Sequence, residues 1–381
     1  MIDSFAPGSD LRIPAGLFKI SGTVTVKPGI KLEAQADVIF KGSVFNNLFN
    51  ASDSTQFSGL GFQNCMNAIM VNGQTGVIVY WCNFNSNIGY AAVNIYNGTN
   101  ISITNSYLYD IKKHGVLING DSATINIQWN NMTNPSRYAG YTTEQISGNV
   151  YCLSGTGITV KNNTLNNNGG QGVIFCYNST TGKGVTNSSI TDNHCEGNGQ
   201  EGVTSYGGST KLTNGNTITG NTCKNNRFNQ LEIWESDNNI VLNNTVEESM
   251  LGVGNLGAIC LYNTKNTICT GNTVLSSNRN GISVIAGSSF CTVSNNTIKD
   301  TNKANYSEVY KGNGILLDWN GIADPHDITI ESNTMSSTGA TIPKSGVYST
   351  SNTKHNNTID SNVITGYQIG VHPYALATCG E

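Results

Sequence analysis

The sequence predicts an all-β fold: a single right-handed parallel β-helix of about 12 or more stacked coils. Three observations lead to this prediction. Only 12% of the 381 residues are charged, and Gly occurs 43 times while Pro occurs 7 times. A short motif, Asn-Asn-Thr followed by an apolar residue, recurs along the chain. A second motif, Gly followed by two alternating apolar residues, recurs about ten residues after it and reads as a short strand.

The first motif returns an Asn to one recurring position of the coil. Stacked coils lie about 4.8 Å apart, so equivalent residues stand above one another. Each side-chain amide can then hydrogen-bond to the next and satisfy polar groups in a buried turn. We interpret this column as a structural ladder. Its members are Asn163, Asn193, Asn221, Asn244, Asn272, Asn296 and Asn333.

The second motif gives the length of each coil. Neighbouring strands are separated by 23 residues (Val93 to Val116) up to 34 residues (Val116 to Val150), which predicts one solenoid with loops of varying length. We expect a single domain over 1–381, with opening coils in 1–45, repeat coils in 46–381, and insertions near 133–147 and 301–311. The first apolar residues of the strands are Ile69, Val93, Val116, Val150, Val173, Val203, Leu231, Ile259, Ile282, Ile315, Val347 and Val371.

Composition excludes several classes of partner. The net charge of −4 gives no basic surface for nucleic acid. No apolar run reaches the roughly 18 residues that a membrane span needs, and no signal peptide is recognisable. The ten Cys fall largely in strand-like runs, so we expect free thiols. No metal site and no cofactor are expected, because there is no Cys-x-x-Cys pair and the His residues are isolated.

Two columns of residues point outward from the strand that follows the Gly. In one of them, three consecutive coils carry Tyr206, Trp234 and Tyr262. Sugar rings pack their C–H faces on aromatic rings, so a run of aromatic residues at the coil spacing favours an extended oligosaccharide. Asp318 follows in the same column, and Arg227 lies in the turn before a strand. We predict that these five residues contact the substrate, although a purely structural aromatic stack fits the pattern too.

Few carboxylates fall on this face. Glu232 lies beside Trp234, Glu201 stands one coil earlier at a strand start, and Glu235 ends the strand of Glu232. Desolvation beside Trp would favour the protonated form that a general acid requires. With leaning side chains, either Glu201 or Glu235 could stand about 6.5–9.5 Å from Glu232, the carboxyl spacing of an inverting glycosidase. We therefore predict Glu232, Glu235 and Glu201 as catalytic residues.

A second cluster surrounds the long coil between Val116 and Val150. It contains Lys113, His114 and Arg137, which we predict to contact the substrate. Basic residues beside a general base are typical of enzymes that act on uronate polymers. His114 is more simply explained as a turn residue bonded to the backbone.

Residues 11–34, which read LRIPAGLFKISGTVTVKPGIKLEA, resemble the opening coil of the pectate-lyase-like superfamily, which includes phage tailspike depolymerases. This resemblance implies a polysaccharide or oligosaccharide substrate, a secreted or virion-associated location and, if the chain is tailspike-like, a homotrimer. Lys113-His114-Gly115-Val116 resembles a strand start of mannuronan C5-epimerases. The signature motifs Asn-Thr-Asp, Gly-His-Gly and Arg-Ile-Lys do not occur. Neither end of the chain carries an obvious cap, so we expect a fragment of a longer protein.

Three function classes follow. The first is a glycoside hydrolase that acts on an extended glycan along the groove, centred on Glu232. The second is a polysaccharide lyase or C5-epimerase on uronate polymers, centred on Lys113 and His114. The third is a non-catalytic glycan-binding spike or adhesin that uses the same aromatic face. We rank the hydrolase first.

Overall fold

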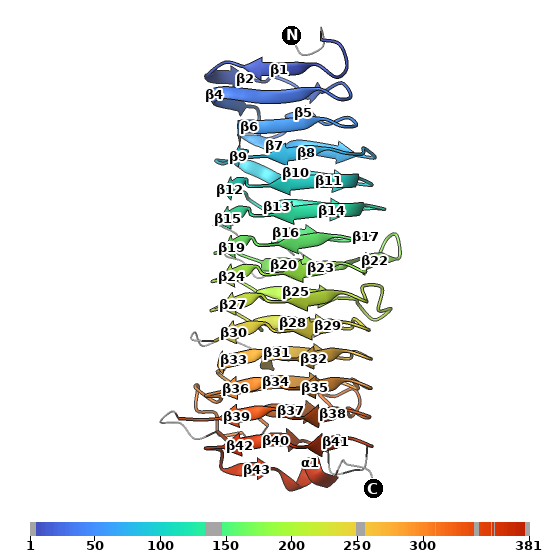
Figure 1. Cartoon of the computed structure of the whole chain (residues 1–381), viewed down its shortest axis with the longest axis vertical. Helices are drawn as coiled ribbons and strands as arrows, with labels where there is room; N and C mark the ends of the chain where they lie inside the picture. The colour runs from blue at the N-terminus through green and yellow to red at the C-terminus, as the bar shows by residue number, and fades with distance from the viewer. Residues whose placement is uncertain are drawn as a thin grey trace. The chain divides into compact units, whose positions relative to one another are not determined.

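The computed structural model describes residues 5–133, 147–248, 256–308, 310–338, 343–351, 353 and 355–377. The chain divides into two compact units, Met1–His194 and Cys195–Glu381. Each unit is a parallel β-solenoid, and Figure 1 shows the strands of its successive coils stacked on one another. The predicted fold class is therefore confirmed. No helix among the described residues is long and apolar enough to cross a membrane.

In each unit, one strand per coil contributes to a parallel sheet that we call sheet 1. In the first unit these strands are β3 (Val24–Thr25), β5 (Phe49–Asn50), β7 (Cys65–Asn72), β10 (Ile88–Tyr96), β13 (His114–Asn119), β16 (Gly148–Cys152) and β20 (Gln171–Phe175). In the second unit they are β25 (Val203–Tyr206), β28 (Leu231–Trp234), β31 (Gly257–Tyr262), β34 (Asn280–Ile285), β37 (Ile315–Asp318), β40 (Ser345–Ser349) and β43 (Ile369–Val371).

The remaining coil strands form the other parallel surface of each unit, sheet 2. In the first unit they are β1 (Asp10–Ile13), β2 (Gly16–Lys19), β4 (Lys31–Lys41), β6 (Gln56–Gln63), β8 (Ile78–Tyr80), β9 (Asn83–Phe84), β11 (Thr99–Thr104), β12 (Tyr107–Tyr109), β14 (Ala123–Gln128), β15 (Asn131–Thr133), β17 (Gly155–Thr156), β18 (Thr159–Lys161), β19 (Thr164–Asn166), β22 (Lys183–Thr186) and β23 (Ser189–Thr191). Strand β24 (His194–Glu196) begins at the last residue of the first unit. In the second unit they are β26 (Thr217–Thr219), β27 (Thr222–Lys224), β29 (Ile240–Leu242), β30 (Thr245–Glu247), β32 (Ile268–Thr270), β33 (Thr273–Ser276), β35 (Thr292–Ser294), β36 (Thr297–Lys299), β38 (Thr329–Glu331), β39 (Thr334–Ser336), β41 (Thr358–Asp360) and β42 (Val363–Thr365).

Two further elements complete the description. The short strand β21 (Tyr177–Asn178) pairs antiparallel with β22 as a hairpin. A single helical turn, α1 (Pro373–Ala377), follows β43. Of the two expected insertions, the one near 133–147 lies almost wholly outside the described residues. The other, 301–311, precedes β37 and packs on the second unit, with Arg279 over the ring of Tyr306.

The Asn column forms the predicted ladder in each unit. In the second unit the amide of Asn244 donates to Oδ1 of Asn272 at 3.0 Å and to the carbonyl of Ile218 at 2.9 Å, and Asn272 continues to Asn296. Asn163 donates in the same way to Asn193 in the first unit. Every member is almost completely buried, so the ladder supplies hydrogen bonds to turns that water does not reach.

The cysteines occupy strand and core positions, as predicted. Nine of them lie in the described residues, and all nine are buried free thiols. Burial raises the pKa of Cys82 and Cys269 to about 12, so these side chains behave as small apolar residues.

One expectation about sheet 1 was wrong. The first outward-pointing residue of each sheet 1 strand was expected on the surface, but most of these residues are buried. Examples are Leu117 and Tyr151 in the first unit and Glu232, Cys260 and Leu316 in the second. The side chains of this column pack on one another from coil to coil. In the second unit, Cys260, Leu316 and Tyr348 of this column join residues of the next outward column in a hydrophobic cluster. The cluster is made of Cys260, Tyr262, Ile285, Ala286, Leu316 and Tyr348, with Trp234 and Leu256 packed against it.

Candidate functional site

The second unit places two carboxylates on adjacent coils of sheet 1. Strands β25 and β28 pair in parallel, with Val203 opposite Leu231 and Thr204 opposite Glu232. Counting two residues back from the first of these pairs gives Glu201 on one coil and Asn229 on the next. Glu201, Thr204, Asn229 and Glu232 thus form two pairs with the same spacing of three residues, and we call this group the carboxylate quartet.

Glu232 is the buried centre of this quartet. Its exposed fraction is 8%, whereas an exposed side chain was expected, because Thr204 and Cys260 pack on either side of it in register. The amide of Asn229 donates to Oε1 of Glu232 at 2.7 Å. Burial raises the pKa of Glu232 well above its usual value, and the nearby carboxylate of Glu201 raises it further, while the Asn229 hydrogen bond lowers it. The neutral acid is therefore favoured.

Glu201 is the carboxylate whose charge acts on this group. Its charge also raises the pKa of Cys260, after the larger contributions of burial and Glu232. Glu201 is more exposed than Glu232. Two acids that interact titrate as a pair, and the acid in the more buried surroundings keeps its proton to higher pH.

The aromatic column is arranged as predicted. Tyr206 lies opposite Trp234, and Trp234 lies opposite Tyr262. The rings of Trp234 and Tyr262 are 3.6 Å apart between centroids and inclined by 6°, so they form a flat double platform. Tyr262 is 8% exposed, less than expected, because it packs in the outer hydrophobic cluster. Trp234 is partly exposed beside Glu232 and offers an apolar face next to the acid.

Other predicted residues lie outside the quartet. Glu235 follows the end of β28 with φ 50°, and its backbone amide donates to the carbonyl of Tyr262. Burial, and after it the charge of Glu235, raises the pKa of Tyr262, whereas Glu201 is the carboxylate that acts on Glu232. Asp318 ends β37, three coils beyond Glu232, and accepts a 2.7 Å hydrogen bond from Thr350. Arg227 lies over the ring of Phe228, 5.9 Å from its centroid.

The first unit holds the Lys113–His114 cluster. His114 begins β13, is 1% exposed and stacks on Tyr151 with centroids 4.8 Å apart, while Tyr90 meets it edge-on. Nζ of Lys113 lies 5.1 Å from the centroid of Tyr90. Burial, with a smaller contribution from Lys113, lowers the pKa of His114 to about 3. Its Nδ1 has no hydrogen-bond partner, and His114 is the first residue of a strand, whereas a turn position was expected. Arg137 lies outside the described residues.

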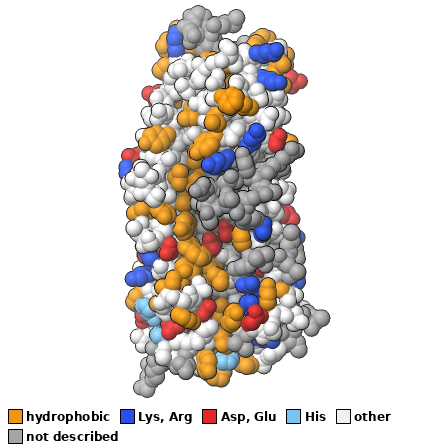
Figure 2. All heavy atoms as spheres, turned by 180° about the vertical axis from the view of Figure 1, so that it is seen from behind, with side chains coloured by type: hydrophobic (Ala, Val, Ile, Leu, Met, Phe, Trp, Pro, Cys, Tyr) orange, Lys and Arg blue, Asp and Glu red, His pale blue; other side chains and the backbone are white. Residues whose placement is uncertain are grey.

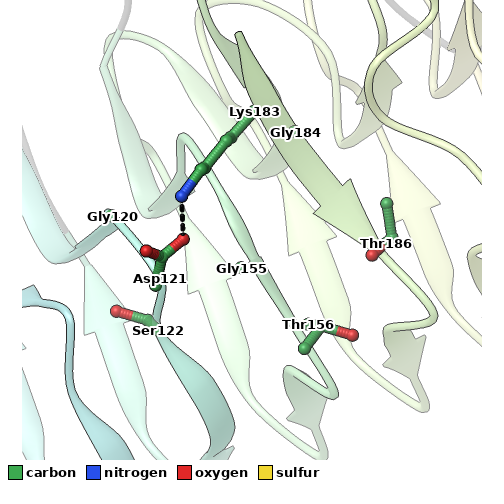
Figure 3. Close-up of a pocket in the computed structure, with 8 residues that line it drawn as sticks. All are labelled: Gly120, Asp121, Ser122, Gly155, Thr156, Lys183, Gly184 and Thr186. Atoms are coloured by element: carbon green, nitrogen blue, oxygen red, sulfur yellow. Dashed lines mark hydrogen bonds and ion pairs between the residues drawn. The ribbon is translucent and has the colours of Figure 1, made fainter. Parts of the chain in front are cut away.

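A polar hollow lies at another corner of the first unit. It has a volume of about 320 Å³ and is lined by Asp121, Ser122, Thr156, Lys183 and Thr186 with three glycines. Figure 3 shows Lys183 reaching across it to an ion pair with Asp121. The hollow carries small polar side chains and one neutralised charge pair, and no aromatic surface. It therefore has neither the paired acids nor the neighbouring aromatic rings of the carboxylate quartet.

Metal binding has no support from the described part of the chain, where no group of three or more His, Cys, Asp or Glu side chains is placed to hold an ion.

Figure 2 shows one face of the molecule, on which hydrophobic side chains gather with acidic side chains beside them. Apolar side chains can pack against a ligand, and acidic side chains beside them can transfer protons to or from it.

Comparison with known proteins identifies the solenoid. Two stretches, residues 48–218 and 182–364, match the family model described as a right handed beta helix region. The chain belongs to the right-handed β-helix family. No curated protein matches this β-helix chain at a significant level.

Solved structures with the same fold are distant in sequence. The β-helix chain is 13% identical to bacteriophage phi29 gene product 12 (pre-mature form), with a TM-score of 0.71, covering 98% of this chain and 54% of that one. It is 16% identical to the Dettilon tailspike protein, with a TM-score of 0.52, over 91% and 63% of the two chains. A PL6 alginate lyase solved with a trisaccharide is 13% identical, with a TM-score of 0.53, over 97% and 82%. The β-helix chain therefore spans 54% and 63% of the length of these two phage proteins.

Two members of the quartet were missed from the sequence. Asn229 stands three residues before Glu232, and Thr204 occupies the position of Glu232 on the preceding coil. Aligning whole coils, in addition to the apolar positions, brings Asn229 and Thr204 beside the acids. What such an alignment cannot supply is which of these polar side chains is buried.

Proposed function

We propose that the chain is a polysaccharide-degrading glycoside hydrolase whose general acid is Glu232. The observation that carries the proposal is the paired carboxylates: a buried Glu232 with a raised pKa beside a more exposed Glu201. Two acids whose surroundings separate their pKa values are the usual arrangement for acid–base hydrolysis of a glycosidic bond. The β-helix fold is compatible with saccharide binding, since a PL6 alginate lyase of the same fold was solved with a trisaccharide.

The reaction needs a proton donor at the glycosidic oxygen. Asn229 occupies Oε1 of Glu232, so the transferable proton of the neutral acid is expected on Oε2. Glu232 gives this proton to the leaving oxygen as the bond to the anomeric carbon breaks. A water molecule adds to that carbon, and Glu201 takes the proton that the water loses. At the end of the cycle Glu201 is protonated and Glu232 ionised, and exchange with solvent restores both.

An inverting mechanism would have the two carboxyl groups about 6.5–9.5 Å apart, with room between them for the attacking water molecule. The platform of Trp234 and Tyr262 supports the sugar ring next to the acid.

The test uses a panel of neutral and acidic polysaccharides: dextran, xanthan, hyaluronan, alginate, polygalacturonate and bacterial O-antigen. New reducing ends and the ultraviolet absorbance of an unsaturated uronate are followed together. We expect reducing ends without absorbance, and a loss of about 10²–10⁴-fold in E232Q. The control is E331Q, because Glu331 is an exposed acid at the end of β38 on sheet 2. Activity that survives E232Q, or is lost equally in E331Q, contradicts the proposal.

A second candidate is a lyase or epimerase on uronate polymers, favoured by Lys113 and the His114–Tyr151 stack. In that reaction Tyr151 or His114 would move a proton at the carbon beside the uronate carboxylate, and Lys113 would neutralise that carboxylate. The low pKa of His114 makes it a weak base, which is why we rank this function second. Absorbance that rises with reducing ends and disappears in K113A would favour it.

A further inference from the structure

The carboxylate quartet contains two polar atoms whose hydrogen bonds are missing. Oγ1 of Thr204 and Oδ1 of Asn229 are both buried and have no hydrogen-bond partner. The two residues are 2% and 5% exposed. Leaving such groups unpaired costs free energy, so protein interiors seldom contain them without a reason.

Both atoms belong to residues that touch the position of Glu232. Thr204 lies directly opposite Glu232 in the register of β25 and β28. Asn229 uses its amide nitrogen on Oε1 of Glu232, which leaves its own oxygen unpaired. The Asn oxygen is an acceptor, while the Thr hydroxyl can donate and accept. Together they provide what one hydroxyl group of a ligand needs: an acceptor for its proton and a donor for its oxygen.

We infer that Thr204 and Asn229 form a subsite for one hydroxyl group of the sugar that Glu232 protonates. This inference rests on the proposed function and adds a residue-level basis for substrate choice. Without ligand, the two atoms have no hydrogen-bond partner. With ligand bound, the sugar hydroxyl forms a hydrogen bond with each atom and is held beside Glu232. A sugar that lacks this hydroxyl leaves them unpaired and is rejected, as in other sites built around buried polar groups.

The matched variants are T204V, which keeps the shape and removes the hydroxyl, and T204S, which keeps the hydroxyl. The substrate is the polysaccharide in the panel that gives Glu232-dependent reducing ends. We expect kcat/KM to fall about 10- to 100-fold in T204V and to recover largely in T204S. The melting temperature of T204V should be no lower than that of the unaltered protein, because the lost hydroxyl bonds nothing in the free state.

Thr264 provides the structural control. It is fully buried, donates to the carbonyl of Ser236 and bonds the hydroxyl of Thr267 at 2.7 Å. T264V should therefore lower the melting temperature. If T204V lowers it to the same extent, Thr204 is structural and the inference is overturned. An unchanged kcat/KM in T204V overturns it too.

The outcome for the subsite is distinct from that for the hydrolase. If E232Q retains full activity, or no polysaccharide is cleaved, the proposed function itself fails. If E232Q is inactive while T204V has unchanged kcat/KM, the hydrolase stands and the hydroxyl subsite is wrong. A loss of activity in E232Q together with a lower kcat/KM in T204V supports both the hydrolase and the subsite, provided that T204V is stable and T204S is active.

Discussion

The side-chain amide of Asn229 donates to Oε1 of Glu232, three residues further along the same coil. This short-range contact binds one oxygen of a buried acid, and in the proposed hydrolysis the other oxygen carries the transferred proton. It also partly offsets the rise in pKa that burial and Glu201 cause in Glu232. Asn229 therefore acts on Glu232 as a positioning residue that tunes the acid.

The first prediction concerns the pH profile of N229A. Activity requires protonated Glu232 and falls as pH rises through its pKa. Removing a hydrogen bond to the carboxylate makes ionisation harder, so the pKa of Glu232 rises and the alkaline limb of kcat/KM moves to higher pH. Rates measured across the pH range check this, with N72A as control, because Asn72 is exposed at the end of β7. A limb that stays in place or moves to lower pH contradicts the assigned role.

A second prediction concerns the aromatic platform. W234A removes half of the Trp234–Tyr262 pair beside the acid. Aromatic packing of this kind contributes about 0.5–1.5 kcal/mol, so we expect KM to rise up to about tenfold with a smaller change in kcat. W129A is the control, since Trp129 is 56% exposed in the other unit. Equal effects of the two variants would argue against a substrate platform at Trp234.

The third prediction is a pH effect on stability from His114. Its pKa is lowered from 6.5 to about 3 in the folded chain, so the unfolded chain binds a proton more readily. The stabilising contribution is complete above pH 6.5 and declines by about 1.4 kcal/mol per pH unit as pH falls toward 3. Urea unfolding between pH 3 and 7 should show a shallower decline in H114Q than in the unaltered chain. A parallel decline in both would show that His114 titrates normally, and H194Q serves as a half-buried control.

A fourth prediction tests the Asn ladder. N244A removes an acceptor for the backbone and side-chain amides of Asn221 and a donor to Asn272. Because these groups are buried, we expect a loss of about 2–4 kcal/mol in the free energy of unfolding. Denaturant unfolding measures this, with N72A as the exposed control. A loss below about 0.5 kcal/mol would mean that water replaces the ladder.

The register of the coils was predictable because a repeated pattern places equivalent residues opposite one another. Tyr206, Trp234 and Tyr262 pair as the alternation predicted. Burial was less predictable. Glu232 points away from the solenoid core, yet it is covered because Thr204 and Cys260 pack beside it. Such packing depends on the sizes of side chains on three coils, which the apolar alternation does not encode. The orphaned atoms of Thr204 and Asn229 were beyond prediction for the same reason.

The Asn ladder has a consequence for how such a chain tolerates changes in length. Consecutive partners in the second unit are separated by 23, 28, 24 and 37 residues, yet each bond has nearly the same length. The geometry of the ladder therefore does not depend on the number of residues between two consecutive Asn residues. A loop between two strands can become longer or shorter by many residues while the Asn residues stay in place. Deleting one residue within a three-residue strand would turn its side chains to the opposite face. Genes of this kind should accumulate insertions at the corners and resist them in the strands.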